Sequence, residues 1–251
     1  GGGGDNNLSS LKSTEIYDSR SGTWSEARLS MNVARRQHTA TALPDGRVLI
    51  TGGLDGANTL NSSEIYFPFK QTWVLVNAPM AEARRGHTAT LIQNGQIFIV
   101  GGFNSGVASK TSELYNVSAM TWTKSVIFID GRFSHTATMM PNGRVLVVAG
   151  NSNSAVPLNG VEFQDPAQDS WNYTAAVANG ATTTMTTERA NHTATLLVNG
   201  KVLVAGGSDF DTTTRSSELF DPATGLWQIT GDLRTERQGH TATLLPDGRV
   251  L

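Results

Sequence analysis

The segment from Arg35 to Gly53 reads RRQHTATALPDGRVLITGG, and a close copy, RQGHTATLLPDGRVL, runs from Arg237 to Leu251. Both contain the phrase His-Thr-Ala-Thr, which holds every histidine of the chain and recurs at intervals of 49, 48, 57 and 48 residues. The histidines are His38, His87, His135, His192 and His240. Self-similarity at such a period is the signature of a repeat architecture.

Other residue types also recur once per unit and in a fixed order. An arginine stands three residues before each histidine, an Asp-Gly or Asn-Gly pair follows the histidine, and an apolar run then ends at glycine. Next comes a glutamate, at Glu15, Glu64, Glu113, Glu162 and Glu218. The unit ends with a tryptophan, at Trp24, Trp73, Trp122, Trp171 and Trp227. Because these residues appear in every copy, we assign them to the architecture of the repeat.

The turn residues predict how each unit folds. Asn-Gly and Asp-Gly are the strongest short signals for a β-hairpin, because both tolerate positive φ. The first strand is the His-Thr-Ala-Thr segment, and the second is the apolar run, for example Arg47 to Thr51. A third strand covers Ser62 to Tyr66 and its equivalents, and a fourth carries the tryptophan. Four antiparallel strands per unit make one blade of a β-propeller.

The glycine doublet after an apolar strand, the downstream aromatic residue and the spaced tryptophan resemble the kelch repeat. The resemblance spans the chain and implies one domain over residues 1–251, an all-β propeller with five kelch-type repeats and the His-Thr-Ala-Thr strand innermost. Thr39, Ala40 and Thr41 are small enough for the crowded axis. Since side chains of this strand point between blades, a histidine metal ring is disfavoured, and we expect no metal and no cofactor.

The repeated charges and rings have structural explanations. An active site is rarely built five times, so we expect each arginine to tie blades together, with Arg84 meeting Glu64 or Glu113. We expect each tryptophan to cover the outer part of the core between blades.

Composition narrows the function classes. A net charge of -2 and the lack of a basic cluster interleaved with aromatics disfavour nucleic acid as a partner. No apolar run approaches the ~20 residues of a membrane span, so we expect no membrane insertion. The absence of cysteine excludes disulfides and thiolate metal sites. It also disfavours copper radical oxidases similar to galactose oxidase, whose cofactor needs a cysteine crosslinked to tyrosine.

Function is expected where the copies differ, on the face that carries the connections from strand two to three and from blade to blade. These connections are rich in polar residues with a few aromatics, a composition that suits a protein or glycan ligand. We therefore predict a non-catalytic recognition or scaffolding module. The alternatives are a carbohydrate-active enzyme using the same face and a structural subunit of an extracellular fibre or coat. The candidate binding residues are Asp55, Asn58, Phe103, Asn104, Asn151, Asn153, Tyr173, Asp209, Phe210 and Asp211.

Two further expectations concern the ends and the compartment. The last hairpin and the first outer strands together make one blade, which predicts a five-bladed ring closed by strand sharing. Alternatively, the chain is part of a six- or seven-bladed propeller, and its terminal strands would allow self-association. Three glycosylation sequons at loops or turns favour an extracellular protein, with a cytoplasmic one as the alternative. These sequons begin at Asn61, Asn116 and Asn172.

Overall fold

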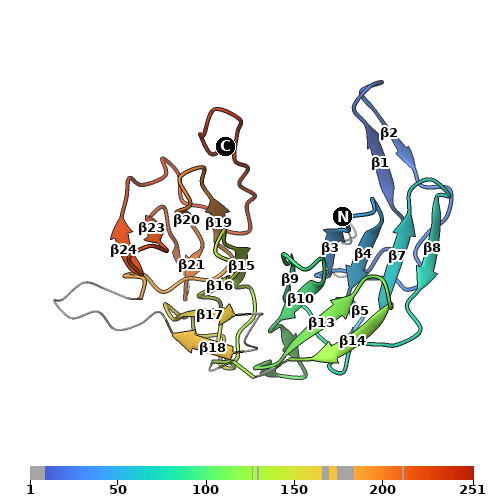
Figure 1. Cartoon of the computed structure of the whole chain (residues 1–251), viewed down its shortest axis with the longest axis horizontal. Helices are drawn as coiled ribbons and strands as arrows, with labels where there is room; N and C mark the ends of the chain where they lie inside the picture. The colour runs from blue at the N-terminus through green and yellow to red at the C-terminus, as the bar shows by residue number, and fades with distance from the viewer. Residues whose placement is uncertain (1–8, 126, 129, 166–169, 174–183, 211) are drawn as a thin grey trace.

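The computed structural model describes residues 9–125, 127–128, 130–165, 170–173, 184–210 and 212–251. All regular structure in this part of the chain is β-strand, arranged as four four-stranded antiparallel sheets and several two-stranded ones. Figure 1 shows the sheets as blades placed around an open arc, with β1–β2 at one end and the C-terminal segment at the other. No helix capable of spanning a membrane occurs among the described residues. The prediction of an all-β propeller is confirmed.

Each blade contains the four strands expected from one repeat, in sequence order from the inside outward. The first blade consists of β3 (Thr39–Ala42), β4 (Val48–Thr51), β7 (Ser63–Phe67) and β8 (Thr72–Leu75). The second consists of β9 (Thr88–Leu91), β10 (Ile97–Val100), β13 (Ser112–Asn116) and β14 (Thr121–Lys124). The third consists of β15 (Thr136–Met139), β16 (Val145–Val148), β17 (Val161–Asp165) and β18 (Ser170–Tyr173). The fourth consists of β19 (Thr193–Leu196), β20 (Val202–Ala205), β23 (Ser217–Asp221) and β24 (Leu226–Ile229).

The Thr-Ala-Thr strands are innermost, as the resemblance implied. β3, β9, β15 and β19 of successive blades contact one another, whereas β8, β14, β18 and β24 lie at the outer edges of their sheets. A further two-stranded sheet pairs β1 (Glu15–Asp18) with β2 (Thr23–Glu26). Small hairpins join strands two and three in three of the blades. They are β5–β6 (Leu54–Asp55, Asn58–Thr59), β11–β12 (Phe103–Asn104, Val107–Ala108) and β21–β22 (Ser208–Asp209, Thr212–Thr213).

The hydrophobic core lies between the blades rather than within one sheet. Alternate residues of β10 point to opposite neighbours: Ile97 and Ile99 pack in the cluster with the first blade, while Phe98 and Val100 pack in the cluster with the third. A third cluster joins the third and fourth blades. Because second strands are buried on both faces, they are apolar at nearly every position, which is why their sequence lacks a polar alternation.

In three of the four blades a glycine follows the second strand where the next blade approaches closely. A Cβ on Gly101, whose φ is +61°, would lie 2.5 Å from the carbonyl oxygen of Arg132 and 2.8 Å from Cε1 of His135. The glycine doublet therefore lets one blade approach the histidine of the following one. In the third blade Ala149 occupies this place, with a φ of +55° that is costly for a residue with a Cβ.

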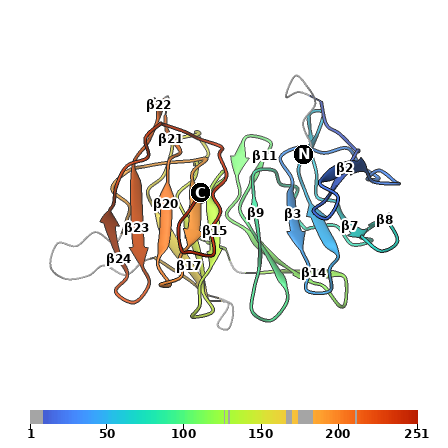
Figure 2. The same ribbon diagram turned by 90° about the horizontal axis from the view of Figure 1, so that it is seen from above.

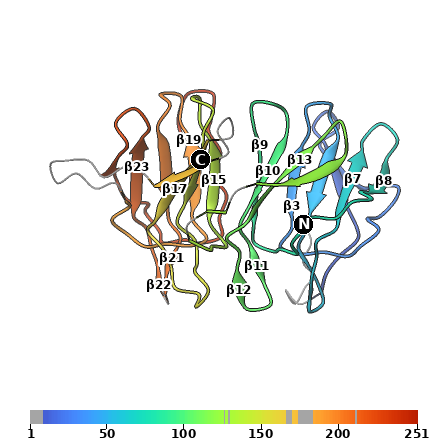
Figure 3. The ribbon, with the colours of Figure 1, turned by 60° about the horizontal axis from the view of Figure 1, so that its bottom comes forward.

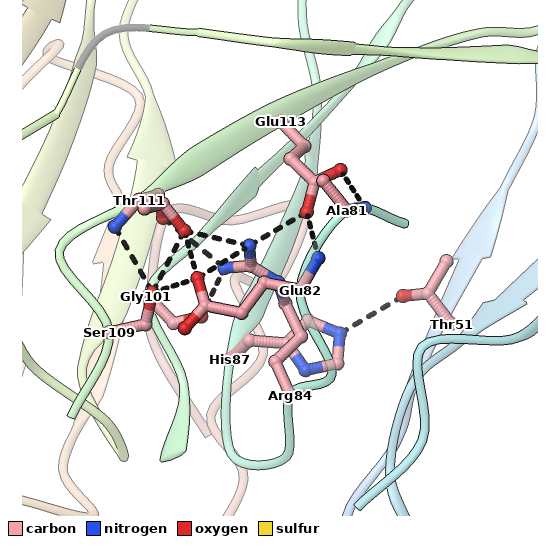
Figure 4. A network of polar contacts seen from close by, with 9 residues as sticks. All are labelled: Thr51, Ala81, Glu82, Arg84, His87, Gly101, Ser109, Thr111 and Glu113. Carbon is pink, nitrogen blue, oxygen red and sulfur yellow. Dashed lines mark hydrogen bonds and ion pairs between the residues drawn. The ribbon is translucent and has the colours of Figure 1, made fainter. Parts of the chain in front are cut away.

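Arg84 pairs with Glu113, one of its two proposed partners, and Glu113 lies in the same blade, so the prediction that the ion pair ties neighbouring blades together is wrong. The fully buried Arg84 guanidinium donates to Glu113 Oε1 at 2.8 Å, to the carbonyl of Gly101 and to Thr111 (Figure 4). The Arg84 carbonyl accepts from the amide of Gly53 in the preceding blade. One residue thus fixes its own blade by its side chain and the neighbouring blade by its backbone.

The same ion pair recurs in three other blades. Its other members are Arg35–Glu64, Arg132–Glu162 and Arg189–Glu218, all buried. Burial raises the pKa of Glu64, but hydrogen bonds from the Asn32 amide, Arg35 and the Val33 amide hold that pKa below its ordinary value. Glu15, the counterpart in β1, is exposed.

The tryptophans cover the outer core only in part. Trp227 is buried, Trp73, Trp122 and Trp171 are half-buried, and Trp24 is 68% exposed on the two-stranded β1–β2 sheet. In four units the indole packs on the aromatic residue directly opposite it, at centroid distances of 4.8 to 5.2 Å. In the third blade Gln164 lies opposite Trp171, which packs instead on Phe98 and Phe128. The prediction is therefore wrong for Trp24.

The strand-sharing closure is not formed. Among the described residues β1 pairs with β2 alone, and the C-terminal hairpin is bridged only within itself, between Leu244 and Val250. The arc in Figure 1 is accordingly open. Membership of a larger propeller stays a prediction.

Candidate functional site

The small hairpins and the connections between blades lie on one side of the disc, here called the loop face. Figures 2 and 3 show β11–β12 and β21–β22 projecting from this side, opposite the hairpin turns that join first and second strands. This arrangement follows from strand polarity, because two tight turns per blade leave all longer connections on the other face. The predicted site residues in the described part of the loops therefore lie on one face, but they are not all together.

Only some of the predicted binding residues line a common hollow. A cleft of about 410 Å³ between β5–β6 and β11–β12 is bordered by Asn58, Phe103 and Asn104. Asp55 pairs with Asn58 across the β5–β6 hairpin. Phe210 lies at the turn of β21–β22 and is 64% exposed.

The other predicted residues have different surroundings. Asn151 is bridged to Phe133, and the Asn153 side chain accepts a hydrogen bond from the amide of Ala108 at 2.6 Å, so it ties two loops together. Asp209 belongs to β21. Tyr173 ends β18, the outermost strand of the third blade, and is thus placed away from the axis. Asp211 lies outside the described residues.

Arg85 is the residue that the sequence interpretation missed. It lines the cleft together with Phe103, and its guanidinium carbon lies 5.2 Å from the centroid of that ring. Phe103 in turn packs on Phe133 at 4.7 Å. Within the described part of the chain Arg85 forms no ion pair or hydrogen bond through its side chain. A guanidinium stacked on an aromatic face with its donors unused is prepared to bind a carboxylate.

A sequence signal for Arg85 does exist. The position directly after the repeated arginine varies among the copies. It is arginine in the first two and a different residue in each of the others, namely Arg36, Arg85, Phe133, Ala190 and Gln238 in order. A position that varies among the repeats, beside one that is the same in all of them, carries a side chain that the blade structure does not require. Loop composition alone does not reveal this position.

The cleft continues into a second hollow of about 440 Å³ at the mouth of the axial channel. Its lining includes Arg85 and Phe103 again, with Gln37, Ser134 and Asn191. These last three residues directly precede histidines and have φ of +54°, +53° and +55°. Their side chains make no hydrogen bond to any described residue, so three polar groups remain available to a ligand.

The backbone of these residues forms a belt around the mouth. The belt consists of Gln37, Gly86, Ser134, Asn191 and Gly239, all with positive φ. The amides of Gly86, Ser134, Asn191 and Gly239 each donate to the carbonyl of the counterpart in the preceding blade, at 2.8 to 3.2 Å. The belt therefore holds the inner ends of the blades together at the loop face.

Below the belt, the histidines lie between blades. His87 Nε2 is 3.0 Å from the hydroxyls of both Thr39 and Thr51 in the preceding blade, as the strand alternation predicts. Burial, reinforced by Arg84, lowers the pKa of His87 to about 3. No group of three His, Cys, Asp or Glu side chains suited to a metal occurs among the residues with described positions.

The three sequons occupy distinct places. Asn61 and Asn172 are exposed, and the Asn116 side chain accepts hydrogen bonds from the amides of Ser118 and Ala119. Their glycosylation stays a prediction.

Comparison with known proteins establishes the family. A family model described as the KLHDC2/KLHL20/DRC7 Kelch-repeats domain matches residues 86–251, about two thirds of the chain. The chain belongs to the kelch-repeat family. No curated protein matches this kelch chain.

A solved structure supports the same fold. The kelch chain is similar to the structure described as "Structure of YjhT", with a TM-score of 0.74 and 15% sequence identity. The match covers 91% of this chain and 82% of the other. At this identity the similarity shows the propeller fold alone.

Proposed function

We propose that this kelch chain is a non-catalytic recognition module that binds an extended protein segment across the loop face. The observation that carries the proposal is the guanidinium of Arg85, stacked on Phe103 without an acidic partner among the described residues, between two connected hollows. A segment carrying a carboxylate side chain would pair with Arg85. Its neighbouring peptide groups would meet the amide and hydroxyl groups of Gln37, Ser134 and Asn191.

The chemistry of the mouth supports binding rather than catalysis. The available side chains are carboxamides, a hydroxyl and a guanidinium, none of which is a general base near neutral pH. His38 and His87 also line the mouth, but burial lowers the pKa of each, to about 4 and about 3. His87 is in addition hydrogen-bonded between blades.

The test is selection of a random peptide library on the immobilised full chain, followed by affinity measurement of the selected peptides. We expect Asp or Glu in the selected sequences, and a loss of about 10- to 100-fold for Arg85→Ala, since a charged hydrogen bond contributes about 1.5–3 kcal/mol. Arg249→Ala is the matched control, because that arginine lies at a hairpin turn of the opposite face and is 79% exposed.

Two results would overturn the proposal. If the selected peptides bound the Arg85→Ala variant as tightly as the wild type, Arg85 would not be part of the binding site. A glycan array that yields Arg85-dependent ligands, where the peptide library yields none, would replace the protein segment by a carbohydrate.

A further inference from the structure

The buried histidines connect neighbouring blades through one ring nitrogen and leave the other without a partner. His135 Nε2 lies 3.0 Å from the Thr88 hydroxyl of the preceding blade, and His192 Nε2 lies 2.9 Å from that of Thr136. Nδ1 of both rings is buried and forms no hydrogen bond to a described residue. A second proton on either ring would therefore sit on Nδ1 in a dry interface without an acceptor.

The charges around His135 oppose protonation as well. Arg132 of its own repeat, Arg84 of the preceding one and the rings of His87 and His192 all face it. Burial is the largest cause that lowers the pKa of His135 well below its ordinary value, and these neighbours add to it. The nearby acids do not compensate, because Glu113 binds Arg84 and Glu162 binds Arg132.

His192 has a similar environment. Burial first, then Arg189 and His240, lower its pKa to about 3. The carboxylate closest to that arginine, Glu218, is bonded to it at 3.0 Å. The same arrangement of a buried imidazole beside an arginine that is paired with a glutamate therefore repeats from blade to blade.

These histidines are covalently adjacent to the belt at the channel mouth. Ser134 precedes His135, and Asn191 precedes His192. The Ser134 amide donates to the Gly86 carbonyl, and the Asn191 amide donates to that of Ser134. A histidine that leaves its interface must therefore pull on the hydrogen bonds that hold the mouth together.

We propose that His87, His135 and His192 make the loop-face site acid-sensitive: their protonation separates the inner ends of the blades and opens the belt before the sheets unfold. The inference rests on the proposed function only for its consequence, which is release of a bound segment in acid. The structural event itself requires no ligand.

The direction follows from proton linkage. Above the ordinary pKa of 6.5 the rings are neutral in the closed and open states, so the closed belt is fully stable. As the pH falls below 6.5 the open state binds protons that the closed state cannot, until the folded pKa near 3 is reached. Within this window each histidine favours opening of its own interface about tenfold per pH unit.

Amide hydrogen exchange on the unliganded protein, corrected for the intrinsic rate, tests the proposal. Between pH 7 and about 5 we expect the protection of the Gly86, Ser134 and Asn191 amides to fall at least tenfold. Amides in the middle of β10 and β16 should keep theirs. In His135→Gln, which retains a polar group opposite Thr88, the protection of Ser134 should lose most of its pH dependence.

Three outcomes would overturn the proposal. The first is equal loss of protection in the belt and the sheets, and the second is the same pH dependence at Ser134 in His135→Gln and wild type. The third is a pKa near 6.5 for the His135 ring of the wild-type protein, measured by carbon NMR. This measurement tests the proposal even if the variant fails to fold. Because none of these measurements uses a ligand, their failure is distinct from failure of the binding proposal.

Discussion

Replacing Arg84 by alanine tests whether the repeated ion pair stabilises the blade that contains it. The guanidinium makes four hydrogen bonds of 2.6 to 3.2 Å, to the Gly101 carbonyl, to both oxygens of Thr111 and to Glu113. The substitution leaves Glu113 buried, with only the amides of Ala81 and Glu82 as donors. It thus removes the charge that compensates a carboxylate inside the molecule.

The expected loss in free energy of unfolding is large. Removing one partner of a buried pair costs about 3–5 kcal/mol. A second carboxylate adds to this, since Glu82 Oε2 lies 3.5 Å from the Arg84 guanidinium and would face Glu113 without it. Total stabilities of domains are about 5–15 kcal/mol. We therefore expect Arg84→Ala to lose about a fifth of the stability or more.

Urea unfolding followed by tryptophan fluorescence near neutral pH measures this loss, and Arg249→Ala is the control. Arg249 binds Asp247 at 2.7 Å, but the two side chains are 79% and 49% exposed. Exposed pairs contribute about 0–1 kcal/mol. If Arg84→Ala lost no more stability than Arg249→Ala, the pair would not be a structural tie.

Four further substitutions test the contacts between blades. In urea unfolding, Ala149→Gly should stabilise the protein by up to about 1 kcal/mol, because glycine adopts a φ of +55° without strain. Gly101→Ala should instead destabilise it by more than about 2 kcal/mol, because the new Cβ would lie 2.5 Å from a backbone oxygen. Thr88→Val leaves His135 Nε2 without its partner, and we expect a loss of about 1–3 kcal/mol by the same assay. Asn153→Ala should leave stability nearly unchanged but speed exchange of the Ala108 amide, its partner at 2.6 Å; unchanged exchange would mean that the loops are held by other contacts.

Much of the fold could be predicted because it depends on backbone contacts that recur in each copy. The Asp45-Gly46 turn needs a residue that tolerates positive φ, and the small residues of β3 and the glycine at Gly101 satisfy requirements that one blade makes on the next. A sequence pattern reports each of these directly. The partner of Arg84 was narrowed to two glutamates, and only the three-dimensional structure separates Glu113 in its own blade from Glu64 in the preceding one.

The site was predicted less well because loop composition does not show which side chains meet. Asn153 and Phe103 look equivalent as loop residues, yet one hydrogen-bonds a neighbouring loop and the other supports a guanidinium. Arg85 was missed because it lies outside the variable connections whose composition predicted the site. The exposure of Trp24 depends on which strands pair beside it, and no local pattern carries that information.

The belt provides an independent argument for a ligand at the mouth. Its backbone conformation is met without cost by glycine, as at Gly86 and Gly239, and the hydrogen bonds that close the belt need no side chain. Gln37 and Ser134 nevertheless adopt φ of +54° and +53°, which costs about 1–3 kcal/mol for a residue with a Cβ. Since the architecture would be served at least as well by glycine, these two side chains are best explained by what they bind. Both line the same hollow as Arg85, the arginine for which the fold also has no use.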